Sequence, residues 1–209
     1  MMKEVNNFEA IIPYLKFKEN LKSIILVWVV KRNKDGNTEA KGNNKNRTIK
    51  SYHFQSLTHF IEKEEEIISL CKEFNCRAYI CVNPKPILNV LFSLQGIVME
   101  HIKEVIHHDT KISLKGMIDS AVMKSGGNGD EKLWVVDIDD YDSNKTQEIV
   151  KTINESRSGF SLNVIAKFPT VHGCHLITHP FDIRDLAAKH PEVEVKKEGL
   201  TLLYAYVKD

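Results

Sequence analysis

The stretch EKLWVVDIDDYD, residues 131–142, runs from an apolar segment straight into aspartates. The apolar part, residues 133–136, predicts a buried β-strand. Four aspartates follow it, at positions 137, 139, 140 and 142. A carboxylate that is buried without a partner costs several kcal/mol. The sequence therefore predicts that a cation or a hydrogen-bond donor meets the end of this strand.

Asp137 and Asp139 are two residues apart, so on an extended strand they project from the same face, about 6.6 Å apart along the chain. Two carboxylates on one face repel each other unless a cation lies between them. A hard divalent ion, Mg²⁺ or Mn²⁺, is the cation that oxygen ligands favour, and it supports phosphoryl or nucleotidyl transfer. The alternative is that residues 139–142 form a polar loop that caps the next helix.

A second pattern lies in KFPTVHGCHLITHPFD, residues 167–182, which predicts two strands joined by a tight turn at His172-Gly173. His175 follows this turn, where an imidazole and free backbone N–H groups can bind a phosphate oxygen. The alternative for His175 is a structural, hydrogen-bonded histidine. A zinc pair of His175 with His179 lacks further ligands at a suitable spacing.

Composition limits the classes of function. The 209 residues carry a net charge of +1, so phosphate contacts over the whole surface are not expected and any nucleic-acid contact must be local. The longest apolar run, residues 24–30, is too short for a membrane span, and no secretion signal opens the chain. Four cysteines without C-x-x-C spacing indicate reduced thiols. A cytoplasmic protein without membrane contact is expected.

The hydrophobic periodicity alternates between strands and helices over one domain, residues 1–209. It predicts strands at 24–30, 76–82, 132–139 and 200–207, besides the pair around the His172-Gly173 turn. Helices are expected at 56–74, from Pro84 or Pro86 to about 105, at 143–155 and at 182–190. This order predicts an α+β (mixed α/β) fold with helices on a mixed, largely antiparallel sheet.

WVVDIDD (134–140) and PTVHGCHLI (169–177), about 35 residues apart, together resemble the motifs of the archaeo-eukaryotic primase and primase–polymerase superfamily. That family has a strand ending in Asp-hydrophobic-Asp, then a turn of small residues before a His on a strand. The resemblance covers residues 76 to 182, and CRAYICVNP (76–84) is similar to the preceding strand in phage or mobile-element proteins. It implies a recognition-motif-like catalytic half and a role in DNA replication.

By this resemblance, Asp137 and Asp139 would hold catalytic Mg²⁺ or Mn²⁺, and His175 would contact the triphosphate of an incoming nucleotide. The family also has a third acidic residue on a late strand. The predicted strand 200–207 has none, and the acidic residues near it are Glu192, Glu194, Glu198 and Asp209. Whether the chain is an active nucleotidyltransferase or has kept the fold without catalysis stays open.

Other classes also use an Asp-x-Asp motif. In a haloacid-dehalogenase-like phosphatase, Asp137 would be the nucleophile and Asp139 the general acid. That motif normally lies near the N-terminus and needs downstream Lys and acidic motifs, whereas only 70 residues follow Asp139 here. A rolling-circle nuclease needs a His-hydrophobic-His pair, which neither HGCH nor HLITH supplies.

The segment KRNKDGNTEAKGNNKNRTIK, residues 31–50, supports a non-enzymatic alternative. Seven basic and two acidic residues give it a local charge of +5. A mobile basic loop, or an extended hairpin, beside a sheet could bind single-stranded DNA or RNA electrostatically. The expected contacts are Lys41, Lys45, Arg47 and Lys50. On this hypothesis the chain is a non-catalytic nucleic-acid-binding accessory protein; its oligomeric state is left undetermined.

Overall fold

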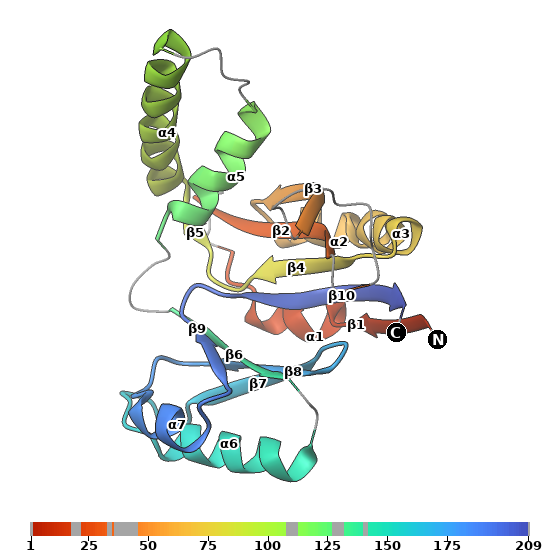
Figure 1. Ribbon diagram of the computed structural model, residues 1–209, viewed down its shortest axis with the longest axis vertical. Helices are drawn as coiled ribbons and strands as arrows, with labels where there is room; N and C mark the ends of the chain where they lie inside the picture. Colours follow the sequence, from red (N-terminus) through yellow and green to blue (C-terminus); the bar gives the residue numbers. More distant parts are fainter. Residues whose placement is uncertain are drawn as a thin grey trace.

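A computed structural model describes residues 2–17, 22–32, 35, 46–107, 113–126, 132–139 and 142–208. These residues form two β-sheets with helices packed on them, and every strand pairing is antiparallel (Figure 1). The predicted α+β class is confirmed. The single predicted sheet is instead divided in two, and the candidate site lies between the parts.

The large sheet joins the two ends of the chain. Its strand order is β1 (Met2–Asn6), β10 (Leu200–Lys208), β4 (Arg77–Cys81), β2 (Ser23–Arg32) and β3 (Asn46–Phe54). The short β5 (Lys85–Pro86) pairs with the start of β2. The apolar run at 24–30 is a central strand, as predicted. Strand β1 was not predicted, because its burial depends on pairing with β10, about 200 residues away.

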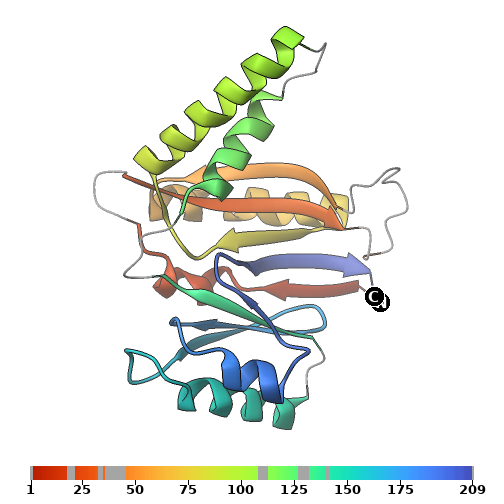
Figure 2. The same cartoon turned by 60° about the vertical axis from the view of Figure 1, so that its left-hand side comes forward.

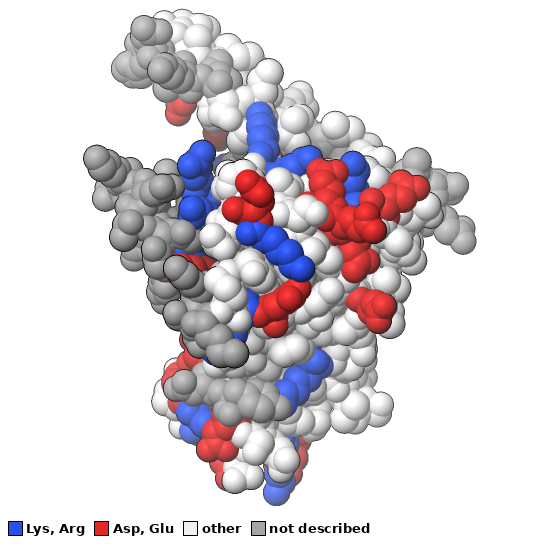
Figure 3. All heavy atoms as spheres, turned by 90° about the vertical axis from the view of Figure 1, so that its right-hand side faces the viewer, with Lys and Arg blue, Asp and Glu red and all other residues white. Residues whose placement is uncertain are grey.

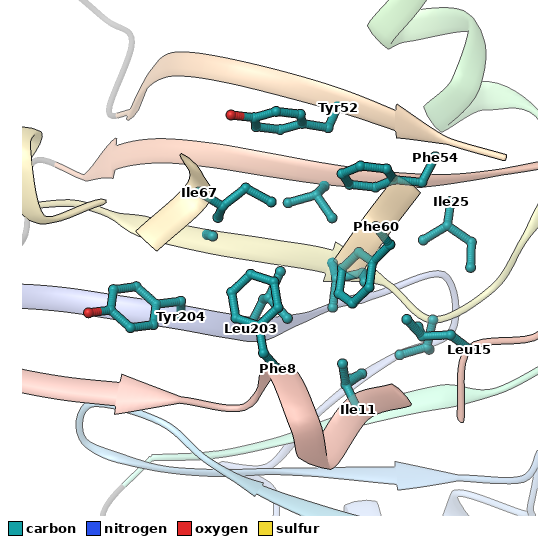
Figure 4. Packing of buried hydrophobic residues seen from close by; sticks show 14 of the residues in the cluster. Phe8, Ile11, Leu15, Ile25, Tyr52, Phe54, Phe60, Ile67, Leu203 and Tyr204 are labelled. Carbon is teal, nitrogen blue, oxygen red and sulfur yellow. The ribbon is translucent and has the colours of Figure 1, made fainter. Parts of the chain in front are cut away.

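One face of the large sheet carries the main hydrophobic core. The helices α1 (Phe8–Ile11), α2 (Leu57–Glu62) and α3 (Glu64–Phe74) contribute to it, and a 3₁₀ turn, η1 (Ile12–Tyr14), follows α1. Figure 4 shows Phe8, Phe54 and Phe60 packed together, with Phe60 edge-on to Phe54. The predicted helix 56–74 is divided at Lys63, but its predicted ends hold. The Ser56 side chain accepts a hydrogen bond from the N–H of His59, and Asn75 adopts a left-handed φ of 47°.

Helices α4 (Ile87–His107) and α5 (Leu114–Lys124) pack at one end of the opposite face, against Leu26 and Cys81. The predicted helices did not include α5. Both helices extend away from the sheets (Figures 1 and 2). No described helix is both long and apolar enough to cross a membrane.

The small sheet has the order β7 (Val164–Pro169), β8 (Gly173–Thr178), β6 (Trp134–Asp139) and β9 (Glu194–Lys196). With α6 (Ser143–Glu155) and α7 (Arg184–Lys189) it runs β6-α6-β7-β8-α7-β9, a βαββαβ unit. Both helices pack on one face, where Val136, Ile138 and Leu176 are buried. Its order of elements is that of the recognition-motif-like half that the resemblance implied. Strand β9 was not predicted. Asp142 caps α6, since its carboxylate accepts from the N–H of Asn144, which agrees with the alternative that the loop after β6 caps this helix.

The helix-free face of the small sheet is turned toward the large sheet. Val135 and Ile177 from this face join the main core. Two buried amides also tie the parts together. The Asn7 side chain donates to the carbonyls of Pro169 and Leu202, one in each sheet. All four cysteines are free and buried, in line with the predicted reduced thiols.

Asn83 forms the second amide link, between the end of β4 and the start of β6. Its side chain donates to the carbonyl of Leu133 at 2.7 Å and accepts from the N–H of the same residue at 2.8 Å. Both residues are buried. Asn83→Ala leaves both backbone groups of Leu133 without a partner, and each such group costs about 1–3 kcal/mol. We expect the free energy of unfolding, measured by urea denaturation, to fall by about 2–4 kcal/mol.

The exposed Asn144 provides a matched control, because only its backbone N–H takes part in the α6 cap. Asn144→Ala should keep the denaturation midpoint close to that of the wild type. If the two variants had equal midpoints, the Asn83 link would not contribute to stability.

Candidate functional site

A cleft of about 1070 Å³ lies between the two sheets. Each sheet contributes one wall. The side chains on the small-sheet wall include Asp137, Asp139, His175, Glu194 and Lys196. The wall of the large sheet includes Trp28, Arg32, Thr48, Arg77 and Tyr79. The volume suits a nucleotide-sized ligand, since small-molecule sites occupy roughly 300–1,000 Å³.

The two predicted motifs meet on the small-sheet wall. Strands β6 and β8 are neighbours, and their register places Asp137 directly opposite His175. The Nε2 atom of His175 lies 3.2 Å from Oδ1 of Asp137. His175 is buried, whereas the Asp137 side chain is 21% exposed and reaches the cleft.

The last strand of the large sheet fixes the ring of His175. Its Nδ1 atom accepts the backbone N–H of Leu202 at 3.2 Å and lies 3.0 Å from the hydroxyl of the fully buried Thr201. A backbone N–H can only donate, so Nδ1 carries no proton in this arrangement. The ring proton is therefore on Nε2, from which it is donated to Asp137. Thus β10, in one sheet, orients a histidine that belongs to the other.

Lys196 of β9 is the cation that pairs with Asp137 on β6. Its Nζ lies 2.5 Å from Oδ2 of Asp137. Burial alone would raise the pKa of Asp137, but the hydrogen bond from His175 and the contact with Lys196 outweigh it and hold that pKa well below its usual range. Burial likewise opposes the charge of Lys196, yet the hydrogen bond and charge of Asp137 raise the pKa of this ammonium group.

Glu194 is a third carboxylate on the same wall. It lies opposite Asp137 in the β6–β9 register, and its Oε2 atom is 3.2 Å from Nζ of Lys196. Sequence reasoning looked for a late acidic residue on strand 200–207 and missed the three-residue β9. The signal was present in EVEVK, residues 192–196, whose period-two alternation predicts a short strand with Glu194 and Lys196 on one face.

Asp139 and the turn of the β7–β8 hairpin also line the cleft. Asp139 is exposed at the end of β6, opposite Gly173. The predicted tight turn is present one residue earlier than expected, at Val171-His172, since the N–H of Thr170 donates to the carbonyl of Gly173 at 2.9 Å and Gly173 already belongs to β8. His172, in the turn, is exposed and lines the cleft. His179 does not face this site and stacks on Phe160, with ring centroids 3.8 Å apart.

The large-sheet wall supplies aromatic and basic side chains that the motif search did not identify. Trp28 lies opposite Tyr79 across β2 and β4. Arg32 donates to the hydroxyl of Tyr79 at 3.1 Å. Arg77 forms a two-pronged pair with Asp35, its Nε atom 2.9 Å from the carboxylate. No local pattern indicates these residues, because the arrangement of strands brings them together.

The charges of the described cleft residues are unequal. Five carboxylates line it, Asp35, Asp137, Asp139, Glu194 and Glu198, against three side chains with a permanent positive charge, Arg32, Arg77 and Lys196. A polyphosphate would meet net negative charge in this cleft unless further cations came with it. Divalent cations are the usual companions of nucleotide triphosphates.

Of the four candidate nucleic-acid residues, the structure describes Arg47 and Lys50. Lys41 and Lys45, with most of the predicted mobile loop, lie outside the described residues. Arg47 and Lys50 are on β3 and exposed, but neither lines the cleft. Lys50 pairs with Glu66 on α3, and hydrogen bonds from Lys50, Lys63 and Tyr52 lower the pKa of Glu66 to about 2. On the face drawn in Figure 3, acidic and basic side chains lie side by side.

The carboxylates of the cleft suit a hard divalent ion by their chemistry. Asp137, Asp139 and Glu194 supply oxygen ligands on one wall, the donor type that Mg²⁺ and Mn²⁺ prefer. As the chain stands, Lys196 is paired with two of these carboxylates. Among the described residues, no group of three or more His, Cys, Asp or Glu side chains is already placed to hold a metal ion. An ion bound here would therefore compete with Lys196.

Comparison with known proteins leaves the site to be interpreted from its own geometry. No family model, no curated protein and no solved structure matches the chain. The fold and the cleft define an α+β protein in which a βαββαβ unit faces a second sheet across an acidic site. The resemblance to primase–polymerases stays a prediction.

Proposed function

We propose that this chain is a primase–polymerase-like nucleotidyltransferase domain that binds a nucleotide triphosphate with Mg²⁺ or Mn²⁺ in the cleft. Its setting would be cytoplasmic, in the replication of phage or mobile-element DNA, with single-stranded DNA or RNA as the polynucleotide partner. The observation that carries the proposal is the Asp137–His175 pair, on adjacent central strands of the βαββαβ unit and facing the cleft.

Different cleft residues would bind the base, the phosphates and the divalent ion. Trp28 and Tyr79 offer aromatic side chains that suit a base, and Arg32 and Lys196 offer donors that suit phosphate oxygens. The single N–H of His175 is donated to Asp137, so His175 would contact a phosphate oxygen once the divalent ion takes that carboxylate. Asp137, Asp139 and Glu194 would hold the divalent ion. When bound, that ion would offset the charge of the triphosphate and of the reaction's transition state. Two buried contacts at Nδ1 hold the ring of His175 in place, so that its Nε2–H points toward Asp137 in the cleft wall.

Nucleotide binding by Asp137→Asn/Asp139→Asn tests this function. In calorimetric titrations with nucleotide triphosphate and Mn²⁺, the double variant should bind at least about tenfold more weakly than wild type, a loss of about 1.4 kcal/mol. Incorporation of labelled nucleotide into a primed template should be lost. Asp185→Asn, an exposed aspartate on α7 outside the cleft, is the control and should behave as wild type. Equal binding by the double variant would contradict the proposal.

One observation favours the second candidate, a non-catalytic nucleic-acid-binding protein on the same fold. Lys196 already neutralises Asp137, so this carboxylate on β6 has a cationic partner without a metal ion.

The variant Lys196→Met distinguishes the two functions. If the site binds a divalent ion, removing the competing ammonium group should increase the rise in melting temperature that Mn²⁺ produces. If the chain is only an accessory protein, the response to Mn²⁺ should stay as in wild type.

The accessory function makes a separate prediction about single-strand binding. Single-strand binding should weaken with salt and should fall when Lys41, Lys45, Arg47 and Lys50 are replaced by Gln. The Asp137→Asn/Asp139→Asn protein should then bind single strands as wild type does. Salt-insensitive binding would contradict this second function.

A further inference from the structure

Helix α4 carries large apolar side chains well beyond its inner face, although it lies at the surface. Its inner face packs on the body of the protein through Val90 and Ile97, which are buried. Seven large apolar side chains point away from that face and are between 43% and 71% exposed: Leu88, Leu91, Phe92, Met99, Ile102, Val105 and Ile106. A contiguous exposed apolar surface of this kind normally marks an interaction site. Figures 1 and 2 show α4 extending beyond the sheets.

The exposed positions follow a coiled-coil pattern. Leu88, Phe92, Gln95, Met99, Ile102 and Ile106 are separated by four, three, four, three and four residues. This spacing is that of the a and d positions of a heptad repeat, with one polar residue near the middle. We call these six residues the α4 stripe. It runs along almost the whole helix, which has 21 residues and is about 31 Å long.

We propose that the α4 stripe is a homodimer interface, on which α4 of a second copy packs in antiparallel orientation. An antiparallel pair centred on Ile97, the middle of the helix, is self-complementary. It sets Leu88 against Ile106 of the other copy, Phe92 against Ile102, and Gln95 against Met99. Such two-fold, isologous contacts are the commonest form of protein oligomer.

The residues that flank the stripe fit the same arrangement. On one side, Leu91 would face Val105 of the second copy, and the half-exposed Val98 would face its own equivalent. On the other side, Gly96 would meet Gly96, and an added Cβ there finds no atom within 4 Å in the single chain. The flank is thus apolar on one side. The other side is open at Gly96, where two helices can approach closely, and it sets the polar Asn89 against Lys103 of the second copy.

The charges on α4 favour antiparallel packing and disfavour a lipid surface. Residues 87–99 carry no charged side chain, and Glu100, Lys103 and Glu104 all lie in the second half. A parallel pair would align Glu100 and Glu104 with their equivalents, whereas the antiparallel pair sets the charged half against the uncharged half. Helices that lie on anionic membranes are rich in Lys and Arg on the polar face. α4 has a single Lys among its residues.

Sedimentation analysis tests the dimer. From about 1 to about 100 μM protein, wild type should reach twice the 24.0 kDa mass of one chain. Phe92→Glu, and separately Met99→Glu, should stay monomeric with unchanged circular dichroism, because both side chains are exposed in the single chain. Leu162→Glu changes an equally exposed leucine away from α4 and should leave the dimer intact.

Cysteine cross-linking tests the orientation. A disulfide needs Cα atoms about 4.4–6.8 Å apart. Leu88→Cys and Ile106→Cys should each fail to cross-link alone under oxidation and should form a linked heterodimer when mixed. Cross-linking of each variant by itself would overturn the antiparallel arrangement. A wild type that stays monomeric throughout, a Phe92→Glu protein that still dimerises, or a monomer that sediments with anionic vesicles would each overturn the dimer.

Discussion

Replacing Gly173 by Ala is expected to lower the free energy of unfolding by about 3 kcal/mol, near the upper end for overpacking in a well-ordered site. Gly173 lies on β8, opposite Asp139 on β6. A Cβ at this position would be 2.0 Å from the backbone oxygen of Ile138 and 3.0 Å from its carbonyl carbon. A backbone carbonyl cannot turn aside as a flexible side chain can. The two strands must therefore separate where the cleft residues meet.

The same substitution should disturb the site, because His175 follows Gly173 by two residues on β8 and contacts Asp137 across the strands. Urea denaturation measures the stability, and Mn²⁺-dependent nucleotide titration measures the effect on the cleft. Gly159→Ala is the matched control, since an added Cβ at that position finds no atom within 4 Å. We expect it to change stability by less than about 0.5 kcal/mol. A Gly173→Ala protein as stable as this control would refute the close approach of the two strands.

Acid should remove much of the stability that Asp137 contributes. Its pKa is lowered in the folded chain: although burial raises it, the hydrogen bond from His175 and the contact with Lys196 prevail. A carboxyl group with a lowered folded pKa stabilises the protein at pH values above its unfolded pKa, about 3.9. That contribution is lost as the pH falls from this value toward the folded pKa. At pH 7, Asp137→Asn should therefore cost on the order of 2 kcal/mol, as is typical of a salt-bridged carboxylate.

Urea denaturation of wild type and Asp137→Asn at pH 7, 5 and 3 checks this prediction. The difference between the two proteins should be nearly constant from pH 7 to pH 5 and should shrink at pH 3, since Asp137 then binds a proton in the unfolded wild-type chain but stays ionised in the folded one. Asp185→Asn should stay close to wild type at pH 7. A difference between wild type and Asp137→Asn that is the same at all three values would show that the Asp137 carboxylate has no pKa shift on folding.

The stability of Asp137→Asn also bears on the proposed function. Its amide can still receive the Nε2–H of His175, but it no longer neutralises Lys196. Nucleotide titrations should therefore be made near pH 7 on protein whose fold is checked by circular dichroism. Loss of nucleotide binding in a folded variant then reports on the cleft and not on unfolding. The dimer test is independent, because no residue of the α4 stripe lines the cleft.

Much of the secondary structure could be predicted because it depends on local patterns. The apolar run at 24–30, the cap at Ser56 and the left-handed Asn75 are each set by the side chains of a few consecutive residues. The same holds for Asp137 and His175. The period of an extended strand sets which residues share a face, so their motifs could be recognised before their contact was known.

The strand pairing could not be predicted in the same way. β1 and β10 come from opposite ends of the chain, and β9 is only three residues long. Because a short strand gains its stability from its neighbours, local composition gives a weak signal for it. For this reason the prediction that a divalent ion would join Asp137 and Asp139 did not include Lys196, the cation that the fold itself places beside Asp137.

The sequence by itself thus determined most of the helices, most of the longer strands and two polar motifs of the candidate site, because each is encoded over a few neighbouring residues. It did not determine α5 or the nine-residue β3, whose first residues were expected in a mobile loop or extended hairpin. Tertiary structure alone decided that the sheet divides in two and that β10 orients His175. It also placed Lys196 and Glu194 beside Asp137, and Trp28 and Arg77 on the opposite wall. These arrangements depend on contacts between segments far apart in the chain, and the free energy of such contacts appears in no local pattern.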